Sequence, residues 1–416
     1  MIGKDRIEGD LISINKILLP LSWLYGMGIG FRNLLFEMGI LKSRSFSTPV
    51  ISVGNITVGG TGKTPHVEYL IRLLKDQAKV AVLSRGYKRK TSGFVLAGND
   101  ATVRTIGDEP YQMKTKFPEI TVAVDKKRTR GIEKLTIGEY VKDIDVILLD
   151  DAFQHRYVKP GINILLVDYH RLIIYDKLLP AGRLREPIES KNRADIVIVT
   201  KCPMDLKPME FRVITKAMSL YPYQQLFFST HEFETLRPVF PNKQKTKKSR
   251  NTQKTQSSQI TQSTQTLSEA LADQHVLLLT GIASPEQMLI DLKAYAKEVT
   301  PLAFSDHHNF KKSDIEQINE AFNALPSPKL IITTEKDETR LKQAEGLSKE
   351  VKSHLYVLPI KIQILLDQEN TFNQTIINYV RKNSRNGLLA QSKDDHKPKD
   401  GDSSGDRPRT ISFRNN

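Results

Sequence analysis

The stretch that decides the fold of this chain is SVGNITVGGTGKTP, residues 52–65. It continues the apolar run Val50–Val53 and precedes a helical pattern that extends from His66 to Leu74. A glycine-rich loop between a strand and a helix, ending in Gly-Lys-Thr, is the setting that a phosphate-binding loop requires. The stretch therefore predicts a P-loop fold that binds a nucleotide.

The groups in this loop have distinct predicted tasks. Its glycines let successive backbone N–H groups turn toward a phosphate, and the helix that begins near Thr64 adds its partial positive charge. Lys63 is predicted to reach the β- and γ-phosphates of ATP, and the Thr64 hydroxyl to ligate Mg²⁺. The predicted nucleotide-binding residues are Gly59, Gly60, Thr61, Gly62, Lys63 and Thr64.

The loop departs from the common P-loop pattern at one position. That pattern, G-x-x-x-x-G-K-[ST], has glycine where this chain has Thr57. We expect Gly59 and Gly60 to restore the bend by another route.

Short β-branched runs alternate with helical patterns along the chain, which indicates a parallel sheet with crossover helices. The first set of predicted strands comprises Val50–Val53, Val80–Leu83, Ile120–Val124, Val146–Leu149, Ile162–Val167 and Ile196–Val199. The second set comprises Gln225–Phe228, Val276–Leu279, Pro301–Phe304, Leu330–Thr333 and Leu355–Leu358. We therefore expect an α/β fold: a P-loop NTPase-like parallel sheet with helices on both faces, a second, smaller α/β domain, and an apolar helical segment at the amino terminus.

Composition divides the chain into four predicted parts. Residues 1–40 form a membrane-associated helical segment, residues 41–224 the P-loop domain, and residues 225–383 the second α/β domain. Within the second domain, the tract 241–266 is basic and polar and almost free of hydrophobic residues, so we expect a mobile insert. The tail 384–416 has the same character and is expected to be disordered.

The amino-terminal segment and the overall charge indicate where the protein works. Residues 17–31 carry no charge but are fewer than the roughly 20 apolar residues that a spanning helix needs. Trp23 and Tyr25 suit the headgroup boundary of a membrane, and the alternative is a buried core helix. The net charge of +15 favours acidic lipid headgroups or phosphorylated substrates, and the single cysteine, Cys202, indicates a reducing compartment. We expect an anionic membrane surface as a partner, and neither nucleic acid nor an obligate protein partner.

A second motif, VILLDDAFQHR at residues 146–156, ends an apolar strand with two aspartates. Carboxylates at the carboxyl end of a strand beside a P-loop hold the metal, directly or through its waters. Successive side chains of an extended segment point to opposite sides, so we expect one of Asp150 and Asp151 to face Mg²⁺ and the other the substrate or a second metal. The alternative is a surface strand end. Gln154 is a candidate either to contact phosphate or to position the loop.

Three further clusters contain candidate residues. Asp108 and Glu109, in Gly-Asp-Glu-Pro, are by themselves typical of a helix start. The Asp-His-His run at residues 306–308 favours a histidine that orients or activates a carboxylate over a zinc site. Arg85 and Arg183 lie in basic loops after apolar runs, where arginine suits phosphate recognition and surface solvation equally well.

Taken together and in this order, the motifs resemble those of the tetraacyldisaccharide 4′-kinases of lipid A biosynthesis. The resemblance covers about residues 15–380 without the polar insert, and Thr57 is itself typical of that family. The shared strings are Leu19-Pro20, VGN, VGGTGKTP, SRGY, GDEP, LDDAFQHR, PAGRLREP, DHH and TEKD.

The resemblance implies an activity and a location. The γ-phosphate of ATP would pass to the 4′-hydroxyl of an acylated glucosamine disaccharide 1-phosphate and give the 1,4′-bisphosphate, at the cytoplasmic face of the inner membrane, with the enzyme bound peripherally. By motif match, Asp108 is the general base and His307 is hydrogen-bonded to it. Lys63 acts on the phosphates, and Thr64, Asp150 and Asp151 hold Mg²⁺. Glu109 would lie close by, and it joins Arg85, Gln154 and Arg183 as a candidate substrate contact.

Two other classes of function remain open from the residues alone. A P-loop GTPase or metal-delivery ATPase also uses Gly-Gly-Thr-Gly-Lys-Thr, and Thr200-Lys201 faintly resembles a guanine-reading loop, although Pro203 stands where an aspartate is expected. A nucleotide-gated membrane-binding module, which is not an enzyme, is the other. Preference for ATP over GTP, and turnover that depends on a glycolipid acceptor, distinguish the kinase from both.

Overall fold

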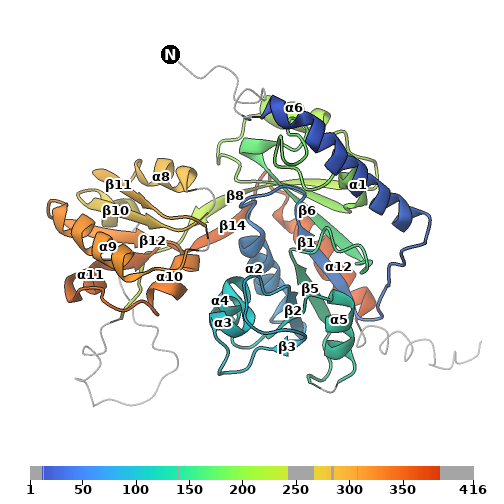
Figure 1. The fold of residues 1–416 in the computed structure, drawn as a ribbon, viewed down its shortest axis with the longest axis horizontal. Helices are drawn as coiled ribbons and strands as arrows, with labels where there is room; N and C mark the ends of the chain where they lie inside the picture. The colour runs from blue at the N-terminus through green and yellow to red at the C-terminus, as the bar shows by residue number, and fades with distance from the viewer. Residues whose placement is uncertain are drawn as a thin grey trace, which may run out of the picture.

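The structure is a computed structural model that describes residues 12, 14–138, 140–241, 267–282, 285–306 and 308–384. It has two lobes, each built on one β-sheet (Figure 1). The predicted insert beyond Pro241, the predicted tail beyond Ser384 and His307 lie outside the described residues.

The larger sheet has nine strands in the order β14-β8-β7-β6-β1-β5-β2-β4-β3. Neighbouring strands are parallel except at the two edges, where β3 and β14 run antiparallel to β4 and β8. In chain order the strands are β1 (Val50–Gly54), β2 (Val80–Ser84), β3 (Val95–Leu96), β4 (Thr121–Val124), β5 (Val146–Asp150), β6 (Ile162–Asp168), β7 (Ile196–Thr200), β8 (Gln225–Phe233) and β14 (Ile360–Ile364). Because β1 lies between β5 and β6, the loop that follows it emerges at the middle of the sheet.

Helices cover both faces of this sheet, as predicted (Figure 1). Alternate residues of each strand enter different hydrophobic clusters because successive side chains of a strand point to opposite faces. One face packs against α2 (Lys63–Leu74), α4 (Asp108–Lys116) and α12 (Glu369–Asn383). The other packs against α5 (Arg128–Thr136), α6 (Pro208–Met218) and the irregular stretch between β6 and β7, which contains the 3₁₀ turns Tyr169–Arg171 and Ile188–Arg193. A short helix, α3 (Val103–Ile106), precedes α4.

The smaller lobe has a five-stranded sheet in the order β11-β10-β12-β13-β9. Its strands are β9 (Arg237–Pro238), β10 (His275–Thr280), β11 (Glu298–Ala303), β12 (Lys329–Thr333) and β13 (Leu355–Val357), and only β9 is antiparallel to its neighbour among these described strands. Its helices are α7 (Leu267–Leu271), α8 (Glu286–Leu292), α9 (Lys312–Ala324), α10 (Glu335–Leu341) and α11 (Lys349–His354). A buried apolar cluster that includes Leu277, Phe322 and Ile331 forms its core.

The division between the lobes differs from the predicted boundary at residues 224 and 225. Strand β8 is parallel to β7, and β14 pairs with β8, so both strands, with α12, belong to the larger lobe. The chain therefore passes between the lobes twice, after β8 and before β14. The sequence of β14, Ile-Lys-Ile-Gln-Ile, alternates as an edge strand does, and this alternation differs from the continuous apolar runs that predicted the other strands.

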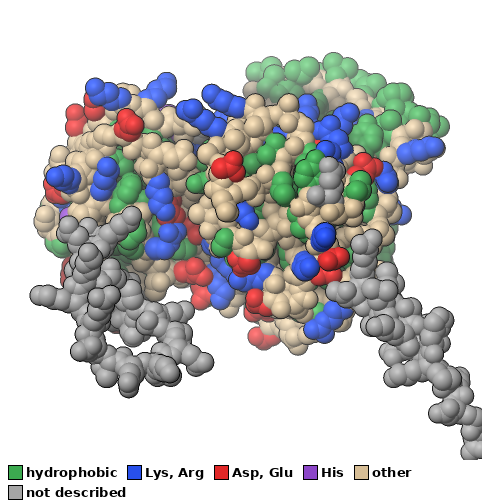
Figure 2. Space-filling model, turned by 90° about the horizontal axis from the view of Figure 1, so that it is seen from below, with side chains coloured by type: hydrophobic (Ala, Val, Ile, Leu, Met, Phe, Trp, Pro, Cys, Tyr) green, Lys and Arg blue, Asp and Glu red, His purple; other side chains and the backbone are tan. Residues whose placement is uncertain are grey.

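The apolar amino-terminal segment forms α1 (Leu19–Glu37) on the surface of the larger lobe, preceded by a 3₁₀ turn at Lys16–Leu18. Only Ser22 and Phe36 of this helix are buried, so it is not the core helix of the alternative prediction. The side chains of Trp23 and Phe31 are 67% and 64% exposed, and Figure 2 shows hydrophobic side chains gathered at the edge where α1 lies. None of the helices in the described ranges has the length and apolar character to cross a membrane.

Candidate functional site

The glycine-rich loop joins the carboxyl end of β1 to the amino terminus of α2. Gly59 and Gly62 have positive φ angles, 124° and 79°, which favour glycine. The buried side chain of Asn55 donates from Nδ2 to the Thr61 hydroxyl, 2.8 Å away. From the other side, the Thr200 hydroxyl at the end of β7 donates to the Thr61 carbonyl oxygen, 3.1 Å away. The loop is therefore held in its turned conformation by side chains of the sheet.

The threonine at position 57 has a structural reason. Thr57 forms an antiparallel bridge with Leu184, and two backbone hydrogen bonds flank this bridge. The Val58 N–H donates to the Arg183 carbonyl at 2.8 Å, and the Arg185 N–H donates to the Ile56 carbonyl at 2.7 Å. Backbone in such an extended pairing accepts a β-branched residue readily, so glycine is not needed here. The bend is made further along, at Gly59 and Gly62.

His66 anchors the first turn of α2 to its surroundings. Its Nδ1 lies 2.7 Å from the Gly62 carbonyl oxygen, and its Nε2 lies 3.0 Å from the hydroxyl of Ser229 on β8. Burial lowers the pKa of His66 to about 4, although the bond to Gly62 acts in the opposite direction. The ring is therefore neutral near pH 7, and its Nδ1–H donates to the loop.

Asp150, the last residue of β5, is fully buried behind the loop. The Ser84 hydroxyl at the end of β2 donates to its Oδ2 at 3.1 Å, whereas Oδ1 has no hydrogen-bond partner within the described residues. Burial and, to a smaller extent, the negative charges of Glu109 and Asp151 raise the pKa of Asp150 to about 7, although Lys63 and the bond from Ser84 act in the opposite direction. A buried carboxylate oxygen that lacks a proton donor has the chemistry of a cation ligand.

Asp151 faces the loop lysine. Its Oδ1 lies 3.5 Å from Lys63 Nζ, and its Oδ2 lies 3.8 Å from the guanidinium of Arg185. Burial acts to raise the pKa of Asp151, but the positive charges of Lys63, Arg185 and Arg128 outweigh it and lower the pKa. The two neighbouring aspartates thus have different surroundings: Asp150 contacts Ser84, and Asp151 contacts Lys63.

The groups around the loop fit a metal that is shared with a nucleotide. No cluster of three or more His, Cys, Asp or Glu side chains in the described part of the chain is arranged to hold a metal ion. Two carboxylates and the hydroxyl of Thr64 are oxygen donors, which Mg²⁺ prefers, and they leave coordination positions for phosphate and water. The donor set is therefore suited to Mg²⁺ carried by ATP.

Asp108 begins α4 at the edge of the larger lobe that faces α10. Gly107 before it has a φ of 92°, and a Cβ there would lie 2.9 Å from the Tyr87 carbonyl oxygen, so this helix start requires glycine. Arg340 of α10 forms a salt bridge with Asp108 Oδ2. Asp108 is therefore both a helix start, as its sequence context indicates, and the partner of a cation from the other lobe.

The second lobe brings two of its motifs to the same place. Lys336 Nζ lies 3.3 Å from Glu109 Oε1 and 3.7 Å from Asp306 Oδ1. The Asp-His-His and Thr-Glu-Lys-Asp runs therefore meet Gly-Asp-Glu-Pro across the lobe boundary. His308 pairs with Asp314 at 2.8 Å within its own lobe. His307 is not among the described residues, and its bond to Asp108 stays a prediction.

The candidate substrate contacts are placed at different depths. Arg85 and Arg183 are exposed, Glu109 pairs with Lys336, and the Gln154 side chain donates to the backbone carbonyl of Asn55. In this structure Gln154 supports the start of the loop, and Arg185, the second arginine of Arg-Leu-Arg, is the one that lies beside Asp151.

Sequence reasoning did not assign roles to Arg128 and Arg340. Arg128 is buried and donates to the carbonyl oxygens of Asp125, at 2.8 Å, and Asp150, at 3.1 Å. Burial lowers its pKa to about 10. Both arginines lie in helical patterns rich in charge, where nothing in the sequence distinguishes a buried cation from a solvated one. Only their contacts with Asp150 and Asp108, which lie further away in the chain, identify them.

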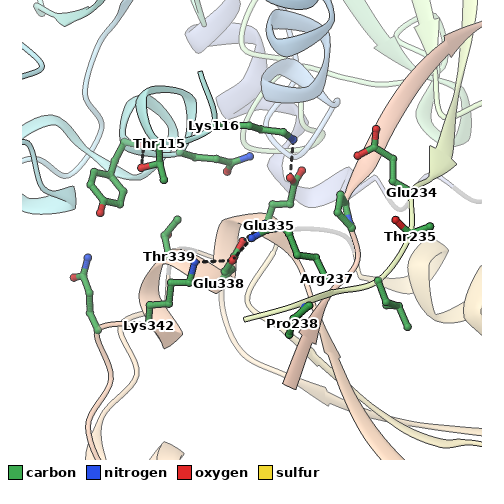
Figure 3. A pocket seen from close by; sticks show the side chains of 15 residues that line it. Thr115, Lys116, Glu234, Thr235, Arg237, Pro238, Glu335, Glu338, Thr339 and Lys342 are labelled. Carbon is green, nitrogen blue, oxygen red and sulfur yellow. Dashed lines mark hydrogen bonds and ion pairs between the residues drawn. The ribbon is translucent and has the colours of Figure 1, made fainter. Parts of the chain in front are cut away.

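A cavity of about 790 Å³ separates the lobes at the other end of α4. Figure 3 shows Lys116 of α4 and Glu335 of α10 paired at its lining, with their charged atoms 2.6 Å apart. Arg237 binds both carboxylate oxygens of Glu338 on the same wall, at 2.8 and 2.6 Å. These named charges are paired, so this cavity is a part of the lobe boundary held by ion pairs.

Comparisons with known proteins agree with this geometry. Residues 14–381 match the model of a family described as tetraacyldisaccharide-1-P 4′-kinase. The chain is 56% identical over 381 residues to the tetraacyldisaccharide 4′-kinase of Phocaeicola vulgatus, covering 91% of this chain and 99% of that one. It is 54% identical over 396 residues to the enzyme of the same name from Bacteroides thetaiotaomicron, covering 94% and 100%.

A solved structure has the same fold. LpxK from Aquifex aeolicus, solved in complex with ATP, superposes with a TM-score of 0.62 at 29% identity, covering 88% of this chain and 98% of that one. The family match extends from the segment before α1 to α12 and includes both lobes and every motif of the site. The chain therefore belongs to the tetraacyldisaccharide-1-P 4′-kinase family.

Proposed function

We propose that the protein transfers the γ-phosphate of ATP to the 4′-hydroxyl of a tetraacylated glucosamine disaccharide 1-phosphate and releases ADP and the 1,4′-bisphosphate. The observation that carries the proposal is the convergence of the Gly-Lys-Thr loop, Asp150 and Asp151 in a member of this kinase family. The ATP-bound relative supports ATP as the donor.

The residues of the site support a division of tasks. Lys63, whose Nζ lies 3.5 Å from Asp151 Oδ1, would neutralise the charge of the β- and γ-phosphates. Thr64, Asp150 and Asp151 would hold Mg²⁺, which supplies further charge neutralisation. The hydroxyl oxygen of the sugar forms the new bond to the γ-phosphorus, the bond from that phosphorus to ADP breaks, and Asp108 accepts the hydroxyl proton. Asp108 acts with His307 in this proposal.

The substrate explains the exposed helix. A lipid with four acyl chains cannot leave the bilayer cheaply, because each CH₂ contributes about 0.8 kcal/mol. The enzyme must therefore reach the lipid at the membrane surface. The exposed apolar side chains of α1 support a peripheral position at the cytoplasmic face of the inner membrane, with α1 in the headgroup region.

The test is incubation with labelled ATP and lipid A disaccharide 1-phosphate, followed by the product mass. We expect the mass of one added phosphate, ATP preferred to GTP, and turnover that requires the acceptor. Lys63→Ala should lose nucleotide binding. Asp108→Asn should retain ATP affinity and lower kcat by about 10²–10⁴-fold, because a positioned base contributes that much.

Three outcomes would contradict the proposal. Hydrolysis of nucleotide at the same rate without acceptor, or a preference for GTP, would favour the GTPase or ATPase alternative. Full activity of Lys63→Ala would remove the phosphate-binding role of the loop. Near-normal turnover of Asp108→Asn would exclude Asp108 as the base.

A further inference from the structure

We propose that Arg340 of the second lobe is the positioning residue for Asp108: its guanidinium fixes the orientation of this carboxylate and keeps it ionised. The inference rests on the proposed function, since it takes Asp108 as the group that accepts the sugar proton. It assigns a task in the reaction to α10, whose Thr-Glu-Lys-Asp motif was given no role by the sequence.

The contact itself joins the two lobes. The Arg340 side chain is only 5% exposed, and one nitrogen of its guanidinium pairs with Asp108 Oδ2 while another lies 3.0 Å from Asp337 Oδ1. A guanidinium presents its donors in a rigid planar fork. Because the other side of the guanidinium is fixed by Asp337, the Asp108 carboxylate is held in one orientation. The flexible ammonium group of a lysine would not fix this orientation.

The fork is fixed by an aspartate that is itself fully constrained. Asp337 is 0% exposed, and its Oδ2 accepts from the Gly281 N–H at 2.9 Å and from the Thr334 hydroxyl at 2.7 Å. Gly281 follows β10, where a Cβ would lie 2.9 Å from Asp337 Oδ1 and displace it. The sheet of the second lobe therefore orients Asp337, Asp337 orients Arg340, and Arg340 orients Asp108.

The helix that carries Asp108 is also tied down at its far end. Lys116 lies 2.6 Å from Glu68 on α2 and 2.6 Å from Glu335 on α10, as Figure 3 shows for the second pair. Helix α4 is thus bound to α10 near both ends, and through Glu68 to the helix that carries Lys63. Asp108 therefore cannot swing freely relative to the phosphate loop.

The charges that face Asp108 make a cation necessary. Glu109, the next residue in the chain, adds a second carboxylate beside Asp108 and faces the same helix of the other lobe. On the facing helix, Lys336 lies between Glu109 and Asp306, and Asp337 lies behind Arg340. The other two charged groups of that helix, Glu335 and Glu338, are paired with Lys116 and Arg237. An opposite charge in contact lowers the pKa of a carboxyl by about 1–3 units, so Arg340 opposes protonation of Asp108.

The test compares Arg340→Met and Arg340→Lys with the unchanged protein in the acceptor assay across pH. We expect Arg340→Met to bind ATP with unchanged affinity and to lose about 10- to 100-fold in kcat, as expected when a reacting group is misplaced. The acid limb of its kcat/KM profile should move up by about 1–3 pH units. Arg340→Lys should restore the position of the acid limb, because it retains the charge, and only part of kcat, because it lacks the fork.

Arg237→Met is the matched control. It removes a guanidinium that binds Glu338 of the same helix and touches neither Asp108 nor Asp337 in the contacts described here. It should leave the acid limb in place, and thermal unfolding should show that all three variants are folded at the assay temperature. An unchanged acid limb in Arg340→Met, or the same shift in Arg237→Met, would overturn the inference. If the unchanged protein hydrolyses ATP but phosphorylates no acceptor, the proposed function fails instead.

Discussion

At the scale of single residues, the site depends on how burial and charge separate groups that are chemically alike. Asp150 and Asp151 are neighbours in the chain, yet their pKa values shift in opposite directions. Burial raises the pKa of Asp150, whereas the cations around Asp151 lower its pKa. The positive φ of Asp151, 48°, turns its side chain toward Lys63 and Arg185 instead of back into the sheet. Two identical side chains can thus hold one metal from different directions.

The buried His66 should make the protein sensitive to acid. Its pKa is about 4 in the folded state against 6.5 for an ordinary histidine, so between these values the unfolded chain binds a proton that the folded chain does not. The free energy of unfolding must therefore fall as the pH falls through this window. At about 1.4 kcal/mol per pH unit, we expect His66 to contribute a loss of about 2 kcal/mol between pH 7 and pH 5.

Urea unfolding of His66→Asn at pH 7 and pH 5 measures the contribution of His66 to this loss of stability. Asparagine can still donate to Gly62 but does not titrate. Between pH 7 and pH 5, the free energy of unfolding of the variant should fall by about 2 kcal/mol less than that of the unchanged protein. The partly exposed His354, replaced by asparagine, provides the control and should lose as much stability as the unchanged protein does. Equal losses in all three proteins would show that His66 does not bind its proton as described.

Single residues also show how far the sequence could predict the site. Gly-Lys-Thr and the strand-end aspartates could be predicted because each requires only a local pattern, and the structure brings Lys63 and Asp151 to 3.5 Å. The role of Arg340 could not be predicted, because it depends on a contact with Asp108, which lies 232 positions away in the chain. Gln154 supports the loop backbone in this structure, and its predicted contact with substrate stays a prediction.

At the scale of elements, α1 is attached to the larger lobe by a few polar contacts and exposes the rest. The Tyr25 hydroxyl donates to the Arg185 carbonyl at 2.9 Å, and the Ala181 N–H donates to the Ser22 hydroxyl at 2.9 Å. These bonds connect α1 to the Pro-Ala-Gly-Arg-Leu-Arg segment, which also carries the arginine beside Asp151. The helix is therefore connected to the site through this segment.

Replacing exposed apolar residues of α1 should release the protein from membranes without unfolding it. Trp23→Asp with Phe31→Asp removes two large side chains, each worth about 1.5–3 kcal/mol when fully buried, and adds two charges of the wrong sign for an anionic surface. We expect co-sedimentation with anionic liposomes to weaken at least about tenfold, from that energy. Ile290→Asp on α8, whose side chain is 58% exposed, is the control. Equal binding of the two variants would contradict the role of α1.

The parallel strands were the easiest elements to predict. Strands β1, β2, β5, β6 and β7 begin at the predicted residue and end one residue later than predicted, because strands covered on both faces are continuous apolar runs. Strands β3 and β9 have two residues each, and β14 alternates, so none gives such a run. Strand β14 was not predicted, and this also explains the wrong domain boundary. Without β14 as its antiparallel partner, β8 was assigned to the second domain instead of to the larger sheet.

At the scale of the whole molecule, the two lobes contribute different parts of one reaction. The larger lobe carries the phosphate loop, the two aspartates proposed to hold Mg²⁺, and Asp108, while the smaller lobe supplies Arg340 and Lys336 at its edge. The chain connects them through β8 and β14, which are themselves paired over five residues. The cavity at the far end of α4 lies beside these connections.

Removal of the polar insert should not affect this arrangement. The described chain leaves the smaller lobe at Pro241, just after β9, and resumes with α7 at Leu267. Replacing residues 242–266 with a flexible Gly/Ser linker should leave kcat and KM within about twofold, because none of the site contacts described here comes from the insert. Acceptor kinetics and thermal unfolding of the shortened protein check this. A large loss of activity in a folded protein would show that the insert takes part in the reaction.

The bridge between Thr57 and Leu184 has a consequence for finding related proteins in genomes. A search that demands glycine at the first place of the loop would discard this chain, although its phosphate-binding half is intact. Since the pairing makes a β-branched residue acceptable at position 57, the identities of the two paired residues should vary together among relatives. A search pattern that spans both segments would therefore separate this kind of loop from ordinary ones more sharply than the loop alone.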